Sequence, residues 1–163
     1  MFFFKKKEKL ETNPKPASAL ILLAVLIFMA IGVRLWQRYH LNTVTFSLNG
    51  QTIRLLVADT PARQNLGLGK RDNLNGYDGM LFTFPEAKQY GFVMRDVRFP
   101  LDIVWFNKGK VVDIAPNLPI EPGVAEVDLR VYYPRDVANA VIEFPAGWAA
   151  QHNLTIGKEL TAL

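Results

Sequence analysis

Residues 79–106 read GMLFTFPEAKQYGFVMRDVRFPLDIVWF, and this stretch decides how the chain folds. It holds three apolar runs with little turn chemistry inside them, a pattern that predicts short strands. One acidic residue, Asp102, lies within the run LDIVWF. A charge inside an apolar run must be paired, hydrogen-bonded or placed at the mouth of a site. We therefore expect any chemistry of this protein near Asp102 and its basic neighbour Arg95.

Turn signals on both sides of this stretch indicate antiparallel hairpins. Asn49-Gly50 separates the apolar runs TVTFSL and QTIRLLVAD. A type I′ turn needs a positive φ at both central residues, which Asn and Gly adopt readily. The sequence Asn-Lys-Gly at residues 107–109 predicts a second hairpin turn, between LDIVWF and KVVDIA.

The remaining residues predict further short strands, two short helices and one long loop. Thr60 and Pro61 are typical of a helix N-cap and a first helical position, and a glycine at 67 or 69 would end that helix. A Pro-rich loop occupies 115–128, a second helix 145–154, and more strands 90–94, 128–133, 138–144 and 155–163. About eight or nine short strands with frequent turns favour a compact antiparallel β-sandwich or partly closed barrel.

The first 36 residues differ from the rest in charge and hydropathy. Residues 1–16 contain five lysines and predict a basic cytoplasmic tail, whereas residues 17–36 are almost entirely apolar. About 20 apolar residues suffice to span a bilayer, and the lysines favour a cytoplasmic N-terminus, so we expect a single transmembrane anchor. A linker, 37–43, and an extracytoplasmic β domain, 44–163, would follow. The alternative is a signal peptide cleaved after Gly32, which would secrete the domain.

Charge and composition exclude several classes of function. Residues 1–38 carry seven Lys or Arg and two Glu, a net charge of +5, whereas residues 39–163 carry twelve Lys or Arg and thirteen Asp or Glu, a net charge of −1. The folded part therefore lacks the positive excess of a nucleic-acid-binding domain. With no Cys and only two His, we expect no metal site and no cofactor.

Several motifs in a fixed order resemble the domain-of-unknown-function family 192. The matching residues are Gly67-Leu68 with Arg71, Gly79-Met80-Leu81-Phe82 with Phe84, Phe92, Met94-Arg95, Pro100-Leu101-Asp102-Ile103, Glu143-Phe144-Pro145-Ala146-Gly147-Trp148 and Gly157. The chain departs from the family pattern at Gly69, Val93 and Asp96. The resemblance implies a compact, mainly β domain of sandwich type, and it supplies no reaction because the family has no established activity.

These observations favour a membrane-anchored, non-catalytic binding or envelope-accessory module over an enzyme. Its partners would be the lipid bilayer, through residues 17–36, and an envelope ligand or protein of unknown identity. The predicted binding residues, beside the Pro-rich loop, are Arg71, Arg95, Asp102 and Asn139.

Two further hypotheses concern the same surface. A pair of carboxylates, Asp96 and Asp102, could instead hydrolyse an envelope glycan as general acid and base. Aromatic side chains could line a sugar or peptide groove, although aromatics on strands are more often core; the candidates are Tyr90, Phe92, Trp105 and Trp148.

Overall fold

The structure is a computed structural model that describes the backbone of residues 16–39 and 41–163, and side chains over 18–33, at Trp36 and over 41–163. The chain divides into two units, one ending at His40 and the other Leu41–Leu163. The predicted basic tail lies outside the described residues except for Pro16.

The first unit contains one helix, α1, Pro16–Tyr39. Proline suits the first helical position, and the following run of Leu, Ala and Ile has good helix formers and no polar face. Its described large apolar side chains are exposed, with Phe28 at 78% and Leu20 at 67%. When only the described residues are counted, no helix combines the length and apolar character that crossing a membrane requires.

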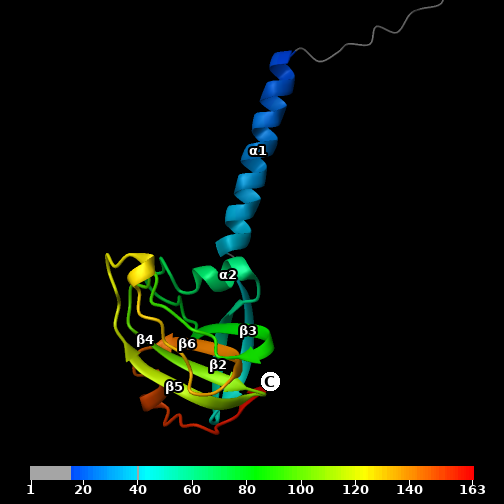
Figure 1. Cartoon of the computed structure of the whole chain (residues 1–163). Helices are drawn as coiled ribbons and strands as arrows, with labels where there is room; N and C mark the ends of the chain where they lie inside the picture. Colours follow the sequence, from blue (N-terminus) through cyan, green and yellow to red (C-terminus); the bar gives the residue numbers. More distant parts are fainter. Residues whose placement is uncertain (1–15, 40) are drawn as a thin grey trace, which may run out of the picture. The chain divides into compact units, whose positions relative to one another are not determined.

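The second unit is built on one seven-stranded sheet with the strand order β5-β4-β6-β3-β2-β1-β7 (Figure 1). Three short helical segments, α2, η1 and α3, lie between its strands. The elements are β1 Asn42–Leu48, β2 Gln51–Ala58, α2 Pro61–Leu66, β3 Gly79–Lys88, β4 Leu101–Asn107, β5 Lys110–Leu118, η1 Glu126–Asp128, β6 Ala138–Pro145, α3 Trp148–Gln151 and β7 Leu160–Ala162.

The sheet curls until its two outer strands approach each other. The N–H of Leu160 donates to the carbonyl of Gly109 at 2.7 Å, and the N–H of Val111 donates to the carbonyl of Lys158 at 2.9 Å. These bonds join the start of β5 to the segment that leads into β7. Of the two architectures that the sequence predicts, the partly closed barrel is the one observed, and the two-sheet sandwich is not.

Local sequence signals place the turns and the first helix correctly. Asn49 and Gly50 have φ values of 51° and 80°, as a type I′ turn requires. Lys108 and Gly109 repeat the pattern, with φ values of 48° and 78°. Thr60 caps α2, since its Oγ accepts the N–H of Arg63 at 3.3 Å. Both hairpin predictions and the α2 prediction are therefore confirmed.

Two of the predicted strands are wrong. Residues 90–94 and 128–133 form only an isolated bridge between Phe92 and Tyr132. Met94 belongs to the apolar cluster on one face of the sheet, Phe92 and Tyr132 pack against that cluster, and the segments do not extend the sheet. An apolar run alone therefore did not distinguish a covering segment from a strand. The C-terminal strand is shorter than predicted, and β3 continues through Pro85 to Lys88.

One strand pair also differs from the expected antiparallel pattern. β2 and β3 are parallel, with Leu55 opposite Gly79 and Ala58 opposite Phe82. The connection between them contains α2, and a crossover of this kind is how parallel neighbours are joined. This crossover places α2 after the end of β2 and beside Thr83 of β3, whose carbonyl accepts a hydrogen bond from Gln64 at 2.9 Å. There α2 borders the cavity described below.

Each face of the sheet has its own apolar cluster. One cluster includes Met80, Phe82, Ile103 and Trp105, and it is covered by the segments between the strands. The other includes Leu81, Val104, Ile142 and Phe144, with Trp148 of α3 packed against it. Successive residues of a strand point to opposite faces, and residues directly opposite on paired strands share a face. Asp102, opposite Phe144, therefore faces the second cluster, and Glu143, opposite Ile103, faces the first.

Candidate functional site

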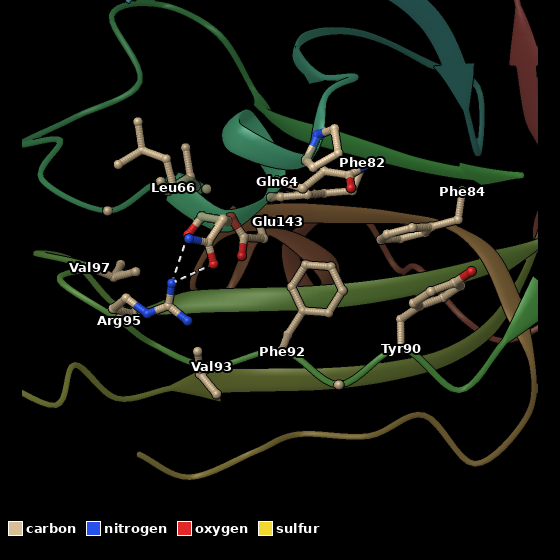
Figure 2. A pocket seen from close by; sticks show the side chains of 16 residues that line it. Gln64, Leu66, Phe82, Phe84, Tyr90, Phe92, Val93, Arg95, Val97 and Glu143 are labelled. Carbon is tan, nitrogen blue, oxygen red and sulfur yellow. Dashed lines mark hydrogen bonds between the residues drawn. The ribbon is translucent and has the colours of Figure 1, made fainter. Parts of the chain in front are cut away.

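A cavity of about 330 Å³ opens between α2 and the segment 90–97 (Figure 2). We call it the Glu143 cavity. It is lined by Pro61, Gln64, Asn65, Leu66, Gly67, Leu68, Gly69, Phe82, Phe84, Tyr90, Gly91, Phe92, Val93, Arg95, Val97 and Glu143.

The carboxyl group of Glu143 lies in the wall of this cavity with one oxygen unpartnered. Glu143 sits in β6 between Met80 of β3 and Ile103 of β4, and only 4% of it is exposed. Its Oε2 makes no hydrogen bond with any described residue. Gly67 lies beside it, and a Cβ on this glycine would be 3.7 Å from Oε2. A side chain at position 67 would therefore pack directly against this buried oxygen.

The environment of Glu143 favours its protonated form. Burial raises the pKa of Glu143 to about 8, and a hydrogen bond from the backbone N–H of Leu68 lowers it only in part. Burial therefore favours the neutral carboxyl group over the ionised one. A protonated carboxyl group can donate one hydrogen bond and accept another.

Arg95 also lines the cavity, and its guanidinium is held by α2 and the Pro-rich loop. Its Nη1 donates to the backbone carbonyl of Asn65 at 3.0 Å and to the Asn65 side-chain oxygen at 2.7 Å. Its Nη2 pairs with Glu126 at 2.9 Å. Its Nε is buried and has no partner among the described residues. In Figure 2 the Glu143 carboxyl group lies between Arg95 and Phe92.

Aromatic rings form the remaining wall. Phe84 and Tyr90 stack with ring centroids 3.7 Å apart. Phe92 meets Phe82 edge-on at 5.0 Å, and Trp105 behind it at 6.2 Å. These contacts fix the ring orientations before any ligand arrives. Of the predicted groove aromatics, Tyr90 and Phe92 line the cavity, whereas Trp105, which is 1% exposed, belongs to the core.

Arg95 also borders a second cavity of about 300 Å³ beneath the Pro-rich loop. The loop contributes Glu121, Val124 and Glu126 to this cavity, and the turn before β4 contributes Asp96. The structure therefore places Arg95 next to the Pro-rich loop, where the sequence predicts a binding surface. No cluster of three or more metal-ligating side chains occurs among residues that the structure describes.

Asp102 is one of four predicted binding residues, and it does not border the Glu143 cavity. Its Oδ1 accepts the N–H groups of Asn117 at 2.8 Å and Gly147 at 3.0 Å, and its Oδ2 accepts that of Ala149 at 2.9 Å. Asp102 thus ties the end of β5 to the start of α3. No ion pair joins Asp102 to Arg95; the guanidinium of Arg95 contacts Asn65 and Glu126 instead.

Three other predicted residues also lie apart from the cavity lining. Asn139 accepts the N–H of Lys108 at 3.1 Å and secures the β4–β5 turn. The backbone N–H of Arg71 donates to Leu68 at 3.3 Å in the turn that follows α2. Asp96, of the alternative catalytic pair, has a φ of 55° and an exposed side chain 3.6 Å from Lys70. Of the predicted ligand-binding and catalytic residues, only Arg95 lines the Glu143 cavity; the predicted groove aromatics Tyr90 and Phe92 line it as well.

Glu143 is the residue that sequence reasoning missed, although a signal for it was present. It is an acidic residue inside the apolar run AVIEF, just as Asp102 lies inside LDIVWF. The rule that a charge in an apolar run needs a partner or a site applies equally to both. The sequence could not say which of the two would find its partners within the fold.

The comparisons with known proteins address the fold and the family. The family DUF192, described as Uncharacterized ACR, matches residues 44–162. The chain belongs to this family. No curated protein matches it.

Two solved structures resemble this DUF192 protein. A protein of unknown function from Novosphingobium aromaticivorans has 27% identity and a TM-score of 0.66, over 75% of this chain and 86% of that one. A "putative transcription regulator" from Sinorhizobium meliloti has 22% identity and a TM-score of 0.65, over 75% of this chain and 95% of that one. At the latter identity the likeness shows the fold alone.

Proposed function

We propose that this DUF192 protein is a non-catalytic binding module that takes a small ligand in the Glu143 cavity. The observation that carries the proposal is the buried, unpartnered Oε2 of Glu143, a residue that lines an open cavity. Leaving a buried polar atom unpaired costs about 1–3 kcal/mol. A ligand that pairs with this oxygen would recover that free energy, which supports a binding role.

Binding is favoured over hydrolysis by the number and placement of carboxyl groups. Glycoside hydrolysis needs two carboxyl groups on either side of the scissile bond. Of the described residues that line the Glu143 cavity, Glu143 alone carries one. Both oxygens of Asp102 accept backbone N–H groups, so this residue has a structural task that competes with a catalytic one. The arrangement therefore supports binding, with the Asp96 and Asp102 hydrolase as the weaker hypothesis.

We also propose that residues 17–36 anchor the module in a membrane, with the N-terminus in the cytoplasm and the β domain outside. Support comes from the uncharged apolar run from Ala17 to Val33 and from the five lysines before it. Alkaline phosphatase fused after Leu163 should be active, since this reporter works only outside the cytoplasm. A green fluorescent protein that fluoresces at the same position would overturn the proposed orientation.

Ligand-observed NMR on the full chain in lipid nanodiscs would test the binding function. The probe is a mixed set of neutral, acidic and basic fragments. Val93→Phe should obstruct the cavity, because Val93 lines it, and should abolish the saturation transfer of the fragments that bind there. The matched control is Val127→Phe, at a site that is 91% exposed and lines neither cavity. If no fragment depends on Val93, the binding function is wrong.

A further inference from the structure

We infer that the Glu143 cavity binds a saccharide, a neutral ring whose hydroxyl groups pair with Glu143 and Arg95 and whose apolar face packs on the aromatic wall. This inference rests on the proposed binding function and names its class of ligand. Three observations lead to it: the unpartnered polar atoms, the charge balance of the cavity and the position of the rings.

The unpartnered atoms call for a ligand that can both donate and accept hydrogen bonds. The Nε–H of Arg95 needs an acceptor, because it is buried without one. The Oε2 of Glu143 is also unpaired and, when protonated, can act as donor or acceptor. A hydroxyl group supplies both functions from one atom, and a sugar ring presents several of them in fixed directions. Hydroxyl groups therefore suit both sides of the cavity.

The charge balance favours a neutral ligand. The guanidinium of Arg95 already has an acidic partner, because Glu126 forms an ion pair with it at 2.9 Å. Glu143 is buried, and burial favours its uncharged form. An organic cation would be repelled by the guanidinium of Arg95. An anion would compete with Glu126 for that guanidinium and would be repelled by any ionised Glu143. A neutral ligand incurs neither cost.

The aromatic wall and the size of the cavity suit one ring. Phe92 lies beside the Glu143 carboxyl group, with stacked Phe84 and Tyr90 next to it (Figure 2). An apolar C–H face of a ring can pack on such side chains while its equatorial hydroxyl groups point toward polar ones. A volume of about 330 Å³ lies at the low end of ligand pockets, which run from roughly 300 to 1,000 Å³. A single sugar unit therefore fits better than a long chain.

The test uses four probes, the methyl glycosides of glucose, galactose, mannose and N-acetylglucosamine. Saturation-transfer NMR would measure their binding to the full chain in lipid nanodiscs, because these contain no sugar-based detergent. At least one glycoside should bind with a millimolar dissociation constant, as expected for a single small ring. Val93→Phe should abolish this signal.

Two substitutions at Glu143 distinguish hydroxyl recognition from recognition of a cation. Glu143→Gln keeps one donor and one acceptor in the same shape, so glycoside affinity should stay within about threefold. Glu143→Leu removes both, and affinity should fall about tenfold, the effect of one lost hydrogen bond. The matched control is Glu86→Gln, at an exposed site outside the cavity. The thermal unfolding midpoint of each variant shows that it is folded.

Each result has a separate meaning. If glycosides fail to bind while basic or acidic fragments bind in a Val93-dependent manner, the saccharide inference is overturned and the binding function stands. If a glycoside binds but Glu143→Leu leaves its affinity unchanged, the assignment of Glu143 as the contact residue is overturned. If no probe of any class depends on Val93, the binding function fails together with the inference.

Discussion

Two buried carboxyl groups on neighbouring strands have opposite surroundings in this protein. Asp102 of β4 accepts three backbone N–H groups at 2.8–3.0 Å. Glu143 of β6, which faces the other apolar cluster, has an oxygen with no partner and borders an open cavity. The difference teaches that burial of an acid does not by itself indicate function. The number of donors that the fold supplies separates a structural carboxyl group from one that is available to a ligand.

A third buried carboxyl group, Asp113 of β5, is intermediate between these two. Its carboxylate accepts hydrogen bonds from the backbone N–H groups of Ile114 and Arg135. It also accepts a hydrogen bond from the Arg135 guanidinium at 2.5 Å. Burial pushes its pKa up, but these hydrogen bonds outweigh burial and hold the pKa below the usual value. One of its partners is an exposed side chain that solvent screens. The series from Asp102 through Asp113 to Glu143 yields three predictions, and the N-cap of α2 beside the cavity yields a fourth.

The largest expected effect follows from Asp102→Ala. Three N–H groups would lose their acceptor, that of Ala149 in a buried hydrogen bond and those of Asn117 and Gly147 in part-buried ones. A buried loss costs about 1–3 kcal/mol and a part-buried loss costs less, so the free energy of unfolding should fall by about 4 kcal/mol. Urea denaturation followed by circular dichroism measures the loss. Asp96→Asn is the control, because Asp96 is exposed and Asn tolerates its positive φ. Equal stability of the two variants would show that Asp102 has no structural role.

Glu143→Gln should stabilise the protein at high pH by about 2–4 kcal/mol. The pKa of Glu143 is raised to about 8 in the folded state. As the pH rises, the unfolded chain therefore loses this proton before the folded protein does. The stability that the neutral Glu143 contributes is fully present below about pH 4.5 and is lost as the pH rises toward 8. Gln stays neutral throughout. The free energy of unfolding of the variant relative to wild type should thus increase between about pH 4.5 and pH 8 and then level off.

Thermal unfolding of wild type and Glu143→Gln from pH 4 to pH 9 measures this advantage. Subtracting one curve from the other removes the titration of every group that the two proteins share. A difference that does not change with pH would mean that Glu143 is already ionised in the folded protein. In that case the neutral character of the cavity, and with it the argument for a neutral ligand, would be lost.

Asp113→Asn should cost about 1–2 kcal/mol at neutral pH, less than the loss at Asp102 because one partner is exposed to solvent. Because the pKa of Asp113 is lowered in the folded state, its effect on stability changes with pH in the opposite direction to that of Glu143. The stability that ionised Asp113 contributes is present above its unfolded-state pKa of 3.8 and is lost as the pH falls through its folded-state pKa. The wild type and the variant should therefore converge in acid, as measured by urea denaturation between pH 2 and pH 7.

The smallest expected effect follows from Thr60→Ala, which removes the N-cap of α2. A lost cap costs about 0.5–2 kcal/mol, and the 3.3 Å bond here suggests the lower end. Because α2 carries Gln64 and Asn65 to the cavity, fragment binding should weaken more than unfolding stability does. Ligand-observed NMR on both proteins compares the two losses. Unchanged fragment binding would show that α2 does not shape the cavity.

Local chemistry was sufficient to predict the elements that short-range signals specify. The two hairpin turns and the start of α2 follow from residues that adopt or prefer one backbone conformation, such as Asn49-Gly50 and Thr60-Pro61. The runs at 90–94 and 128–133 were predicted as strands and are covering segments. Their pattern is equally compatible with both roles, because either one buries apolar side chains.

By itself, the sequence determined the β class, the turns, the division between an apolar N-terminal segment and a near-neutral domain, and the importance of acids within apolar runs. Only the tertiary structure decided which acid is satisfied. Hydrogen-bond partners of Asp102 come from residues 15 to 47 positions away, and the cavity beside Glu143 joins α2, β3 and the 90–97 segment. Such long-range neighbours depend on how the sheet curls, and no local pattern encodes that curvature.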